Sequence, residues 1–251
     1  MPWFNASPPI RSPENRSHVA LPLTKDVFAT LRAALLAADG QWSLSPSARL
    51  VELSAMVVFP GAAQQDPHSD VPPDYDVNIG TLWLALQDVT ASMGPLTVYS
   101  AEPAAVRRQL DWRSLHEYSL REERRRSVRH FDSDGEPAES SSAPLPVPPA
   151  AAAESAAFLA ALGDPVPLLL KCGDVALMDC RTFHFGSKHT GGEARAVLSV
   201  TFEEDAEETN HRRDGTEYAG FTRLLDPSVA ARQFRLGDFK PNSCNQEPTT
   251  T

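Results

Sequence analysis

The chain has 251 residues, 41% of them apolar and 22% charged, which is enough to bury the core of one sizeable globular domain. Its net charge of −10 disfavours nucleic acid and anionic membrane surfaces as partners. No apolar run approaches the roughly 18 residues of a membrane span. The 3 cysteines lack metal-type spacing and argue against a disulfide framework. The first residues lack the apolar core of a secretion signal, so we expect a cytoplasmic protein, with a peroxisomal or other organelle left open. The oligomeric state cannot be read from the sequence.

The N-terminal part of the chain predicts a tail followed by one helix. Residues 1–22 are rich in Pro, Ser and Asn and are expected to be extended or disordered. A helix is predicted from Thr24 to Ala38, with Thr24 as its N-cap and Gly40 as its stop. Its apolar residues recur at helical spacing, which gives it one face for packing.

Short apolar segments bounded by Gly, Pro and Asp predict a series of strands. They are Leu50–Phe59, Asn78–Leu86, Leu96–Tyr99, Val166–Lys171, Val175–Met178 and Ala196–Phe202. Short strands joined by tight turns favour a sandwich or barrel over alternating βαβ units. The sequence therefore predicts a mainly β protein.

A long insertion separates the third of these strands from the fourth. A highly charged helix is expected over Pro103–Arg129, a Ser/Pro/Ala-rich flexible stretch over Asp132–Ala152, and a short helix over Ala153–Leu162. Because strand-like segments resume afterwards, we expect one domain over residues 23–251, interrupted at about 103–163 and flexible at about 132–152.

The sharpest chemical signal is His68-Ser69-Asp70. Residues two apart in an extended segment point to the same face, so His68 and Asp70 can present an imidazole and a carboxylate to one ion. The third ligand has to come from a distant strand, and His184 is the best candidate, with His189 as its rival. Two histidines and one carboxylate occupy one face of an octahedron, the arrangement of non-haem Fe(II) oxygenases.

Several further motifs accompany this pair in a fixed order. They are Gln65-x-x-His68-x-Asp70, Leu82-Trp83-Leu84-Ala85-Leu86-Gln87-Asp88, Met93-Gly94-Pro95-Leu96-Thr97-Val98, Gly173-Asp174-Val175-Ala176-Leu177-Met178-Asp179, Arg181-x-x-His184, and Arg195. In this order they resemble the phytanoyl-CoA dioxygenase family of Fe(II)- and 2-oxoglutarate-dependent oxygenases. The motifs cover somewhat under a third of the chain.

The resemblance implies a fold, a set of cofactors and a reaction. The fold is a double-stranded β-helix, a cupin-like jelly roll with flanking helices. The metal ligands are His68, Asp70 and His184, and Arg195 grips the distal carboxylate of 2-oxoglutarate with its planar fork. Gln65 and Trp83 support the co-substrate. The enzyme is a dioxygenase that uses O2, with ascorbate as a possible support, and releases succinate and CO2. We expect it to hydroxylate an aliphatic C–H bond of a small organic or lipid-like substrate.

Two alternatives to an oxygenase stay open. The first is a non-catalytic jelly-roll protein that binds a ligand or a structural metal. The second is an interaction protein that acts through the basic helix Arg107–Arg129, although a solvated helix face is the favoured explanation of that charge. The remaining histidines lie in polar surroundings and are expected to be solvated: His18, His116, His130 and His211.

Overall fold

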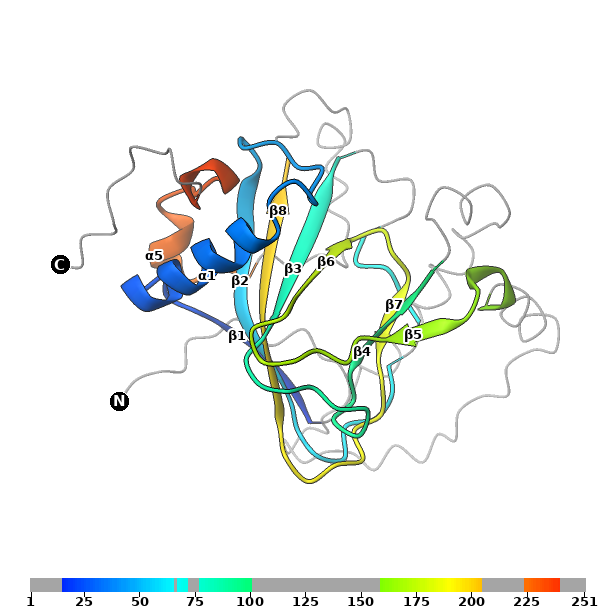
Figure 1. Ribbon diagram of the computed structural model, residues 1–251. Coiled ribbons are helices and arrows are strands. Elements are labelled where there is room, and N and C mark those ends of the chain that lie inside the picture. Colours follow the sequence, from blue (N-terminus) through cyan, green and yellow to red (C-terminus); the bar gives the residue numbers. More distant parts are fainter. Residues whose placement is uncertain (1–14, 66, 72–76, 101–158, 205–223, 240–251) are drawn as a thin grey trace, which may run out of the picture.

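A computed structural model describes residues 15–65, 67–71, 77–100, 159–204 and 224–239 (Figure 1). The basic helix, the flexible stretch and most of the N-terminal tail predicted from the sequence lie outside these residues. At the end of the predicted insertion, residues 159–162 are helical. None of the helices in these ranges is both long and apolar enough to span a bilayer.

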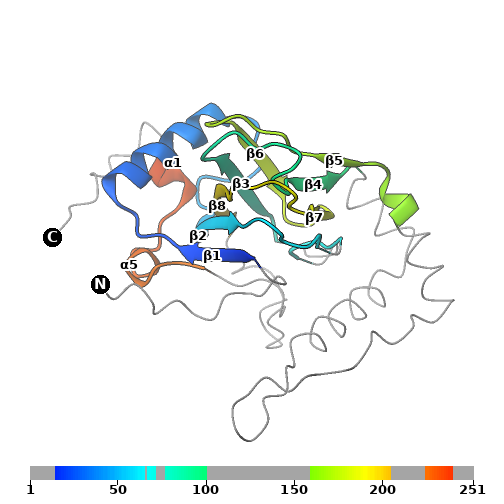
Figure 2. The same ribbon diagram turned by 90° about the horizontal axis from the view of Figure 1, so that it is seen from below.

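The described strands form two antiparallel sheets, one of five strands and one of three. The larger sheet contains, in spatial order, β1 (Arg16–Ala20), β2 (Arg49–Val58), β8 (Arg195–Glu203), β3 (Ile79–Ala85) and β6 (Val175–Asp179). The smaller sheet contains β5 (Pro165–Pro167), β4 (Leu96–Tyr99) and β7 (His184–Gly186). In Figures 1 and 2 the smaller sheet faces one side of the larger sheet.

The route of the chain between the sheets identifies the fold. From β2 in the larger sheet the chain crosses to the smaller sheet, where His68 pairs with His184 on β7, and returns to β3. It then forms β4 and β5 in the smaller sheet, β6 in the larger, β7 in the smaller and β8 in the larger. This alternation between two facing antiparallel sheets is a double-stranded β-helix, so the predicted jelly-roll fold is confirmed.

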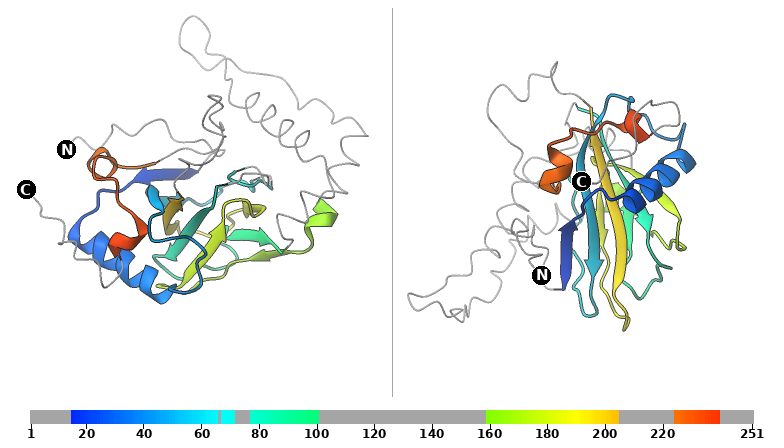
Figure 3. Two further views of the ribbon diagram at one scale, coloured as in Figure 1. Left: turned by 90° about the horizontal axis from the view of Figure 1, so that it is seen from above. Right: turned by 90° about the vertical axis from the view of Figure 1, so that its left-hand side faces the viewer.

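The two faces of the larger sheet carry different kinds of side chain. Its outer face is covered by α1 (Lys25–Ala37), α5 (Pro227–Ala230) and the 3-10 helix η3 (Leu236–Phe239) (Figure 3). The main apolar core lies there and includes Leu31, Leu35, Leu50, Leu53, Leu82, Leu198, Val200, Phe202 and Phe239. A smaller apolar cluster joins the inner face to the smaller sheet through Trp83, Met178, Val197, Met56, Leu96 and Val98.

The predicted helix forms with the predicted cap. The Thr24 hydroxyl accepts a hydrogen bond from the Val27 amide (3.3 Å), which satisfies one of the free donors of the first turn. After the helix, Gly40 adopts a φ of +79°, a conformation that favours glycine at a helix end.

The predicted strands agree with the structure in most places and differ in three. β4 has the predicted bounds, whereas β5 ends at Pro167 instead of Lys171, because the chain then leaves β4 and the Leu170 carbonyl accepts from Val89 (2.7 Å). The strands β1 and β7 were not predicted. The sheet begins at Arg16, before the expected domain boundary at residue 23, because β1 pairs with β2 along its whole length.

A comparison of a buried and an exposed leucine should show how much the main core contributes to the free energy of unfolding. Leu82 is 0% exposed, whereas Leu86, just beyond the same strand, is 45% exposed. We expect Leu82→Ala to lower the free energy of unfolding by roughly 2–5 kcal/mol. The matched variant Leu86→Ala should lower it by less than about 1 kcal/mol. Urea denaturation followed by circular dichroism measures both, and equal losses would contradict this placement of the core.

Candidate metal centre

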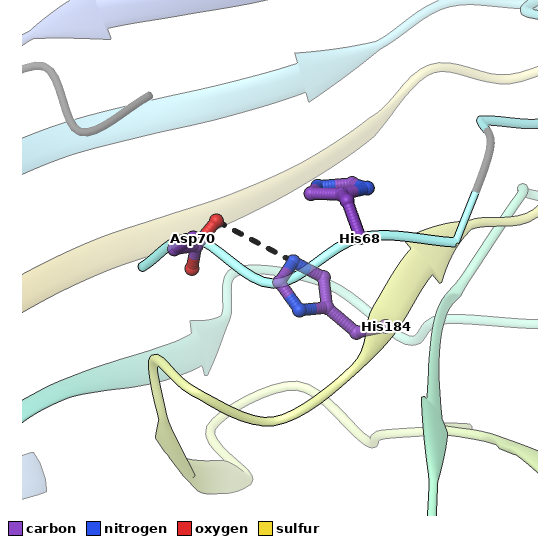
Figure 4. A group of neighbouring side chains, drawn as sticks. All are labelled: His68, Asp70 and His184. Carbon is purple, nitrogen blue, oxygen red and sulfur yellow. Dashed lines mark ion pairs between the residues drawn. The ribbon is translucent and has the colours of Figure 1, made fainter. Parts of the chain in front are cut away.

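Three side chains from distant parts of the sequence meet on the inner side of the jelly roll (Figure 4). His68 and Asp70 lie on the segment between β2 and β3, and His184 is the first residue of β7. One ligand atom from each residue lies within 4.8 Å of those of the other two. These are the three residues predicted from the sequence to share one ion, and the structure brings them together.

Backbone hydrogen bonds fix the segment that carries His68 and Asp70. The His68 amide donates to the His184 carbonyl (2.9 Å), and the His184 amide donates to the His68 carbonyl (2.8 Å). Two residues farther on, the Asp70 amide donates to the Cys180 carbonyl (3.0 Å). The segment is therefore held at both of its candidate ligands, and their side chains project to one side, as the spacing of two residues requires.

The His184 ring is held so that one of its nitrogens faces Asp70. Nδ1 lies 2.9 Å from the Thr182 carbonyl oxygen, which can only accept, so Nδ1 carries the proton in that bond. In the neutral ring Nε2 is then an acceptor, and it lies 3.6 Å from Asp70 Oδ1, which is also an acceptor. Two acceptors that face each other need a proton or a cation between them. The hydrogen bond at Nδ1 is the one that typically orients a metal-binding imidazole.

Arg195, the first residue of β8, is a buried cation with few partners. It is 3% exposed, and its Nη1 donates to the Gly94 carbonyl (2.6 Å). Its Nη2 lies 3.8 Å from the Met56 sulfur, and Nε has no hydrogen-bond partner among the described residues. Burial, and then the charge of Arg16, lower the pKa of Arg195 to about 10, which leaves it charged at neutral pH. Within the described ranges no carboxylate pairs with it, so the guanidinium is suited to an anionic partner.

Arg195 and His184 lie in different sheets of the jelly roll. β8 lies in the larger sheet between β2 and β3, whereas β7 lies in the smaller sheet. Arg195 thus reaches the interior from the sheet that faces His184. The interior therefore combines inner-face residues of both sheets. No local sequence pattern reveals this combination.

His18 belongs to this interior, contrary to the expectation that it is solvated. It lies on β1 opposite Met56 and is half-buried, whereas its neighbour Val19 is 45% exposed on the other face. Burial lowers the pKa of His18, while Glu52 and Asp70 raise it and Arg16 and Arg195 lower it further. Because Asp70 and Arg195 both act on this one ring, His18 belongs to the same interior as the candidate metal centre and the arginine.

Two more polar groups on the inner face have no partner among the described residues. Trp83 on β3 lies opposite Ser199 on β8, and both side chains are buried, at 7% and 0% exposure. Neither the Trp83 indole N–H nor the Ser199 hydroxyl is hydrogen-bonded within the described ranges. Ser199 lies four residues from Arg195 on the same face of one strand. Buried polar groups are normally paired, so this row is suited to a polar ligand.

Gln65 and Arg16 support the strand that carries His184. The Gln65 side-chain carbonyl accepts from the Gly186 amide (2.8 Å), and the Gln65 amide donates to the Gly186 carbonyl (2.9 Å). Arg16 Nη2 donates to the carbonyls of Ala63 (2.8 Å), Gly186 (3.2 Å) and Ser187 (2.9 Å). Among the described residues Gln65 therefore contacts β7, and a role for it at the co-substrate stays a prediction.

The rival ligand His189 lies away from the cluster. It is 1% exposed, its Nε2 lies 2.8 Å from the Glu193 carbonyl, and its backbone pairs with Met93. In the turn before β7, Arg181 pairs with Asp179 (Nη2 to Oδ2, 2.5 Å), and the Thr182 amide donates to the Asp179 carbonyl (2.8 Å). This turn presents the Thr182 carbonyl that orients His184.

Comparison with known proteins gives distant similarities in structure alone. No family model matches the chain, and neither does any curated protein. Among solved structures, the non-haem alpha ketoglutarate dependent epimerase SnoN of nogalamycin biosynthesis is 17% identical, with a TM-score of 0.43 over 75% of this chain. The chain covers 61% of SnoN. HygX from Streptomyces hygroscopicus, with nickel and 2-oxoglutarate bound, is 13% identical, with a TM-score of 0.46 over 75% of this chain and 70% of HygX. Because these identities and TM-scores are low, the assignment of the fold rests on the strand order and not on these similarities.

Proposed function

We propose that this protein is an Fe(II)- and 2-oxoglutarate-dependent oxygenase, with His68, Asp70 and His184 as metal ligands and Arg195 as the co-substrate anchor. One observation carries the proposal. Nε2 of His184 faces Oδ1 of Asp70 beside His68, in the same interior as a buried arginine with which no described carboxylate pairs. A divalent cation and a dianion would together satisfy both sites.

The donor set fits this metal. Two imidazoles and one carboxylate, drawn from one side, suit a ferrous ion and leave coordination positions open. A closed structural zinc site would require a fourth protein ligand, and within the described ranges the cluster contains three. When bound, Fe(II) and 2-oxoglutarate supply the activation of O2 and the oxidation of an aliphatic C–H bond, with release of succinate and CO2.

The residues of this chain bind and orient the cofactors. Asp70 contributes a negative charge to the metal, and the Thr182 carbonyl keeps the His184 proton on Nδ1 so that Nε2 can coordinate. Arg195 pairs with the far carboxylate of the co-substrate, for which its planar fork is suited. Ser199 and Trp83 lack hydrogen-bond partners on the described inner face and would donate hydrogen bonds to the same ligand. The apolar side chains of Met56, Met178 and Val197 limit water in the interior.

The two buried histidines provide a matched test of the metal ligands. His184→Gln should lower the affinity for Ni(II), a redox-stable substitute for Fe(II), by more than about a hundredfold, because it removes a ligand and not merely a supporting hydrogen bond. His189→Gln should leave that affinity nearly unchanged, since His189 lies outside the cluster. Isothermal titration calorimetry on both full-length variants measures this. Equal losses in the two variants would contradict the assignment.

Arg195 can be tested without turnover. In the presence of Ni(II), 2-oxoglutarate should raise the melting temperature of the natural protein by roughly 5 °C or more at saturation. Arg195→Gln should remove most of this rise, because the buried fork no longer meets the carboxylate. Arg232→Gln, an exposed arginine near α5, should keep it. A full rise in Arg195→Gln would show that the co-substrate is held elsewhere.

The reaction itself has a simple readout. Purified protein with Fe(II), ascorbate, O2 and 2-oxoglutarate should release succinate slowly even without a primary substrate, and Asp70→Ala should abolish that release because the metal loses its charged ligand. Succinate is quantified by mass spectrometry. A protein that binds zinc after purification without chelators and releases no succinate would instead be a non-catalytic jelly-roll protein.

A further inference from the structure

Arg16 has hydrogen-bond donors that its support of β7 does not use. It is half-buried at the start of β1, and its Nη2 donates to the carbonyls of Ala63, Gly186 and Ser187. Its other two guanidinium nitrogens, Nε and Nη1, are buried and have no hydrogen-bond partner among the described residues. A buried N–H group without an acceptor is costly, so these two nitrogens are suited to the oxygen atoms of a ligand.

Arg16 and Arg195 leave the larger sheet from the same row of residues. Val58 of β2 lies opposite Arg16 of β1 on one side and opposite Arg195 of β8 on the other. Residues in one row of a sheet point to the same face, so both arginine side chains enter the interior of the jelly roll. Two strand spacings, roughly 10 Å, separate the backbones from which they start.

The two guanidinium groups also end beside each other. Arg195 Nη1 donates to the Gly94 carbonyl (2.6 Å), and Arg16 Nη2 donates to the Ser187 carbonyl (2.9 Å). These carbonyls belong to adjoining segments, because the Ser187 amide donates to the Pro95 carbonyl (2.9 Å) and a Cβ placed on Gly94 would lie 2.6 Å from the Ser187 oxygen. Two buried cations therefore converge on one place, and in agreement with this the charge of Arg16 lowers the pKa of Arg195.

The charges of the interior favour one anion that both arginines share. The charged side chains that act on the His18 ring are Arg16 and Arg195 on one side and Glu52 and Asp70 on the other, so their charges cancel. Fe(II) adds two positive charges and 2-oxoglutarate adds two negative ones, which leaves the loaded interior neutral. A second anion for Arg16 would upset this balance. The co-substrate that pairs with Arg195 is therefore the best partner for Arg16 as well.

We propose that Arg16 and Arg195 form a two-arginine clamp that holds the far carboxylate of 2-oxoglutarate. This inference rests on the oxygenase function proposed above and adds a second anchor to it. A carboxylate has two oxygens with about four lone-pair sites, and the clamp offers three nitrogens without partners, Nε and Nη1 of Arg16 and Nε of Arg195. A keto acid with an uncharged far end would leave these donors unpaired, so the clamp selects a co-substrate with two carboxylates.

Two keto acids of nearly equal size test the clamp. 2-Oxovalerate carries a methyl group where 2-oxoglutarate has its far carboxylate, and both have the same metal-chelating end. We would titrate each into the full chain loaded with Ni(II), using calorimetry. Arg16→Gln should weaken the binding of 2-oxoglutarate by about tenfold or more, the loss expected for hydrogen bonds to a charged group. The same variant should leave the binding of 2-oxovalerate nearly unchanged, because that ligand has no group for the clamp.

Control variants separate a contact with the ligand from support of β7. Arg16→Gln should keep the Ni(II) affinity of the natural protein, whereas a purely structural role would lower the affinities for Ni(II) and for both keto acids together. Lys188→Gln removes an exposed positive charge next to Ser187 and should keep the 2-oxoglutarate affinity. Arg16→Lys keeps the charge without the planar set of donors, so its loss should be smaller than that of Arg16→Gln. The losses of Arg16→Gln and Arg195→Gln should not add, because both residues contact one carboxylate.

The clamp and the oxygenase function can fail separately. An unchanged 2-oxoglutarate affinity in Arg16→Gln, or an equal loss for both keto acids, would overturn the clamp and leave the oxygenase in place. Glutarate has the same far carboxylate but no keto group, so we would also titrate it without metal. Binding of glutarate that depends on Arg16, in a protein that fails to bind Ni(II), would retain the clamp and reject the oxygenase. A protein that binds neither 2-oxoglutarate nor glutarate would reject both.

Discussion

The interior of this jelly roll contains charged side chains that have no ion-pair partner of opposite charge among the described residues. Arg195 and Arg16 are close enough to lower the pKa of Arg195 by mutual repulsion, and no described acid pairs with either of them. Glu52 and Asp70 act on the same His18 ring as these two arginines, yet among the described residues no ion pair joins either acid to either arginine. A protein that buries such groups loses stability unless ligands complete the pairing. The site is therefore electrostatically incomplete without a cation and an anion, and this incompleteness supports the proposal more strongly than the identity of any single ligand.

The fold separates this site from the elements that stabilise it. The outer face of the larger sheet packs against α1 and η3 through leucines and phenylalanines, and this is where most of the buried apolar surface lies. The inner face has a smaller apolar cluster and carries the polar groups. Because alternate residues of one strand serve the two faces, β2 and β8 each contribute to the core and to the site. The core can thus offset the cost of the polar interior without sharing side chains with it.

The division between an apolar outer face and a polar inner face explains which parts of the structure the sequence could predict. Strands with a largely apolar sequence, such as β3, were found with nearly correct bounds. β1 was missed because its inward residues are Arg16 and His18, so it lacks apolar alternation, and β7 was missed because it has three residues. The cluster of His68, Asp70 and His184 was predicted because His68 and Asp70 are two residues apart and because the family resemblance supplied His184. Glu52 and Ser199 were not, although polar residues two apart within an apolar strand, Glu52 with Ser54 and Ser199 with Thr201, carried a signal.

A single irregularity in β2 decides which of its residues reach the site. Leu50 and Leu53 both belong to the outer core, yet they are three residues apart, and in a regular strand an odd separation puts side chains on opposite faces. The register shift between Leu50 and Glu52 resolves this conflict by leaving Val51 without a cross-strand partner. Without it, Glu52 and Ser54 would point toward the helices and Leu53 into the polar interior, because a shift of one residue exchanges the two faces. The bulge therefore lets β2 supply apolar side chains to the outer core on both sides of the shift and polar side chains to the inner face.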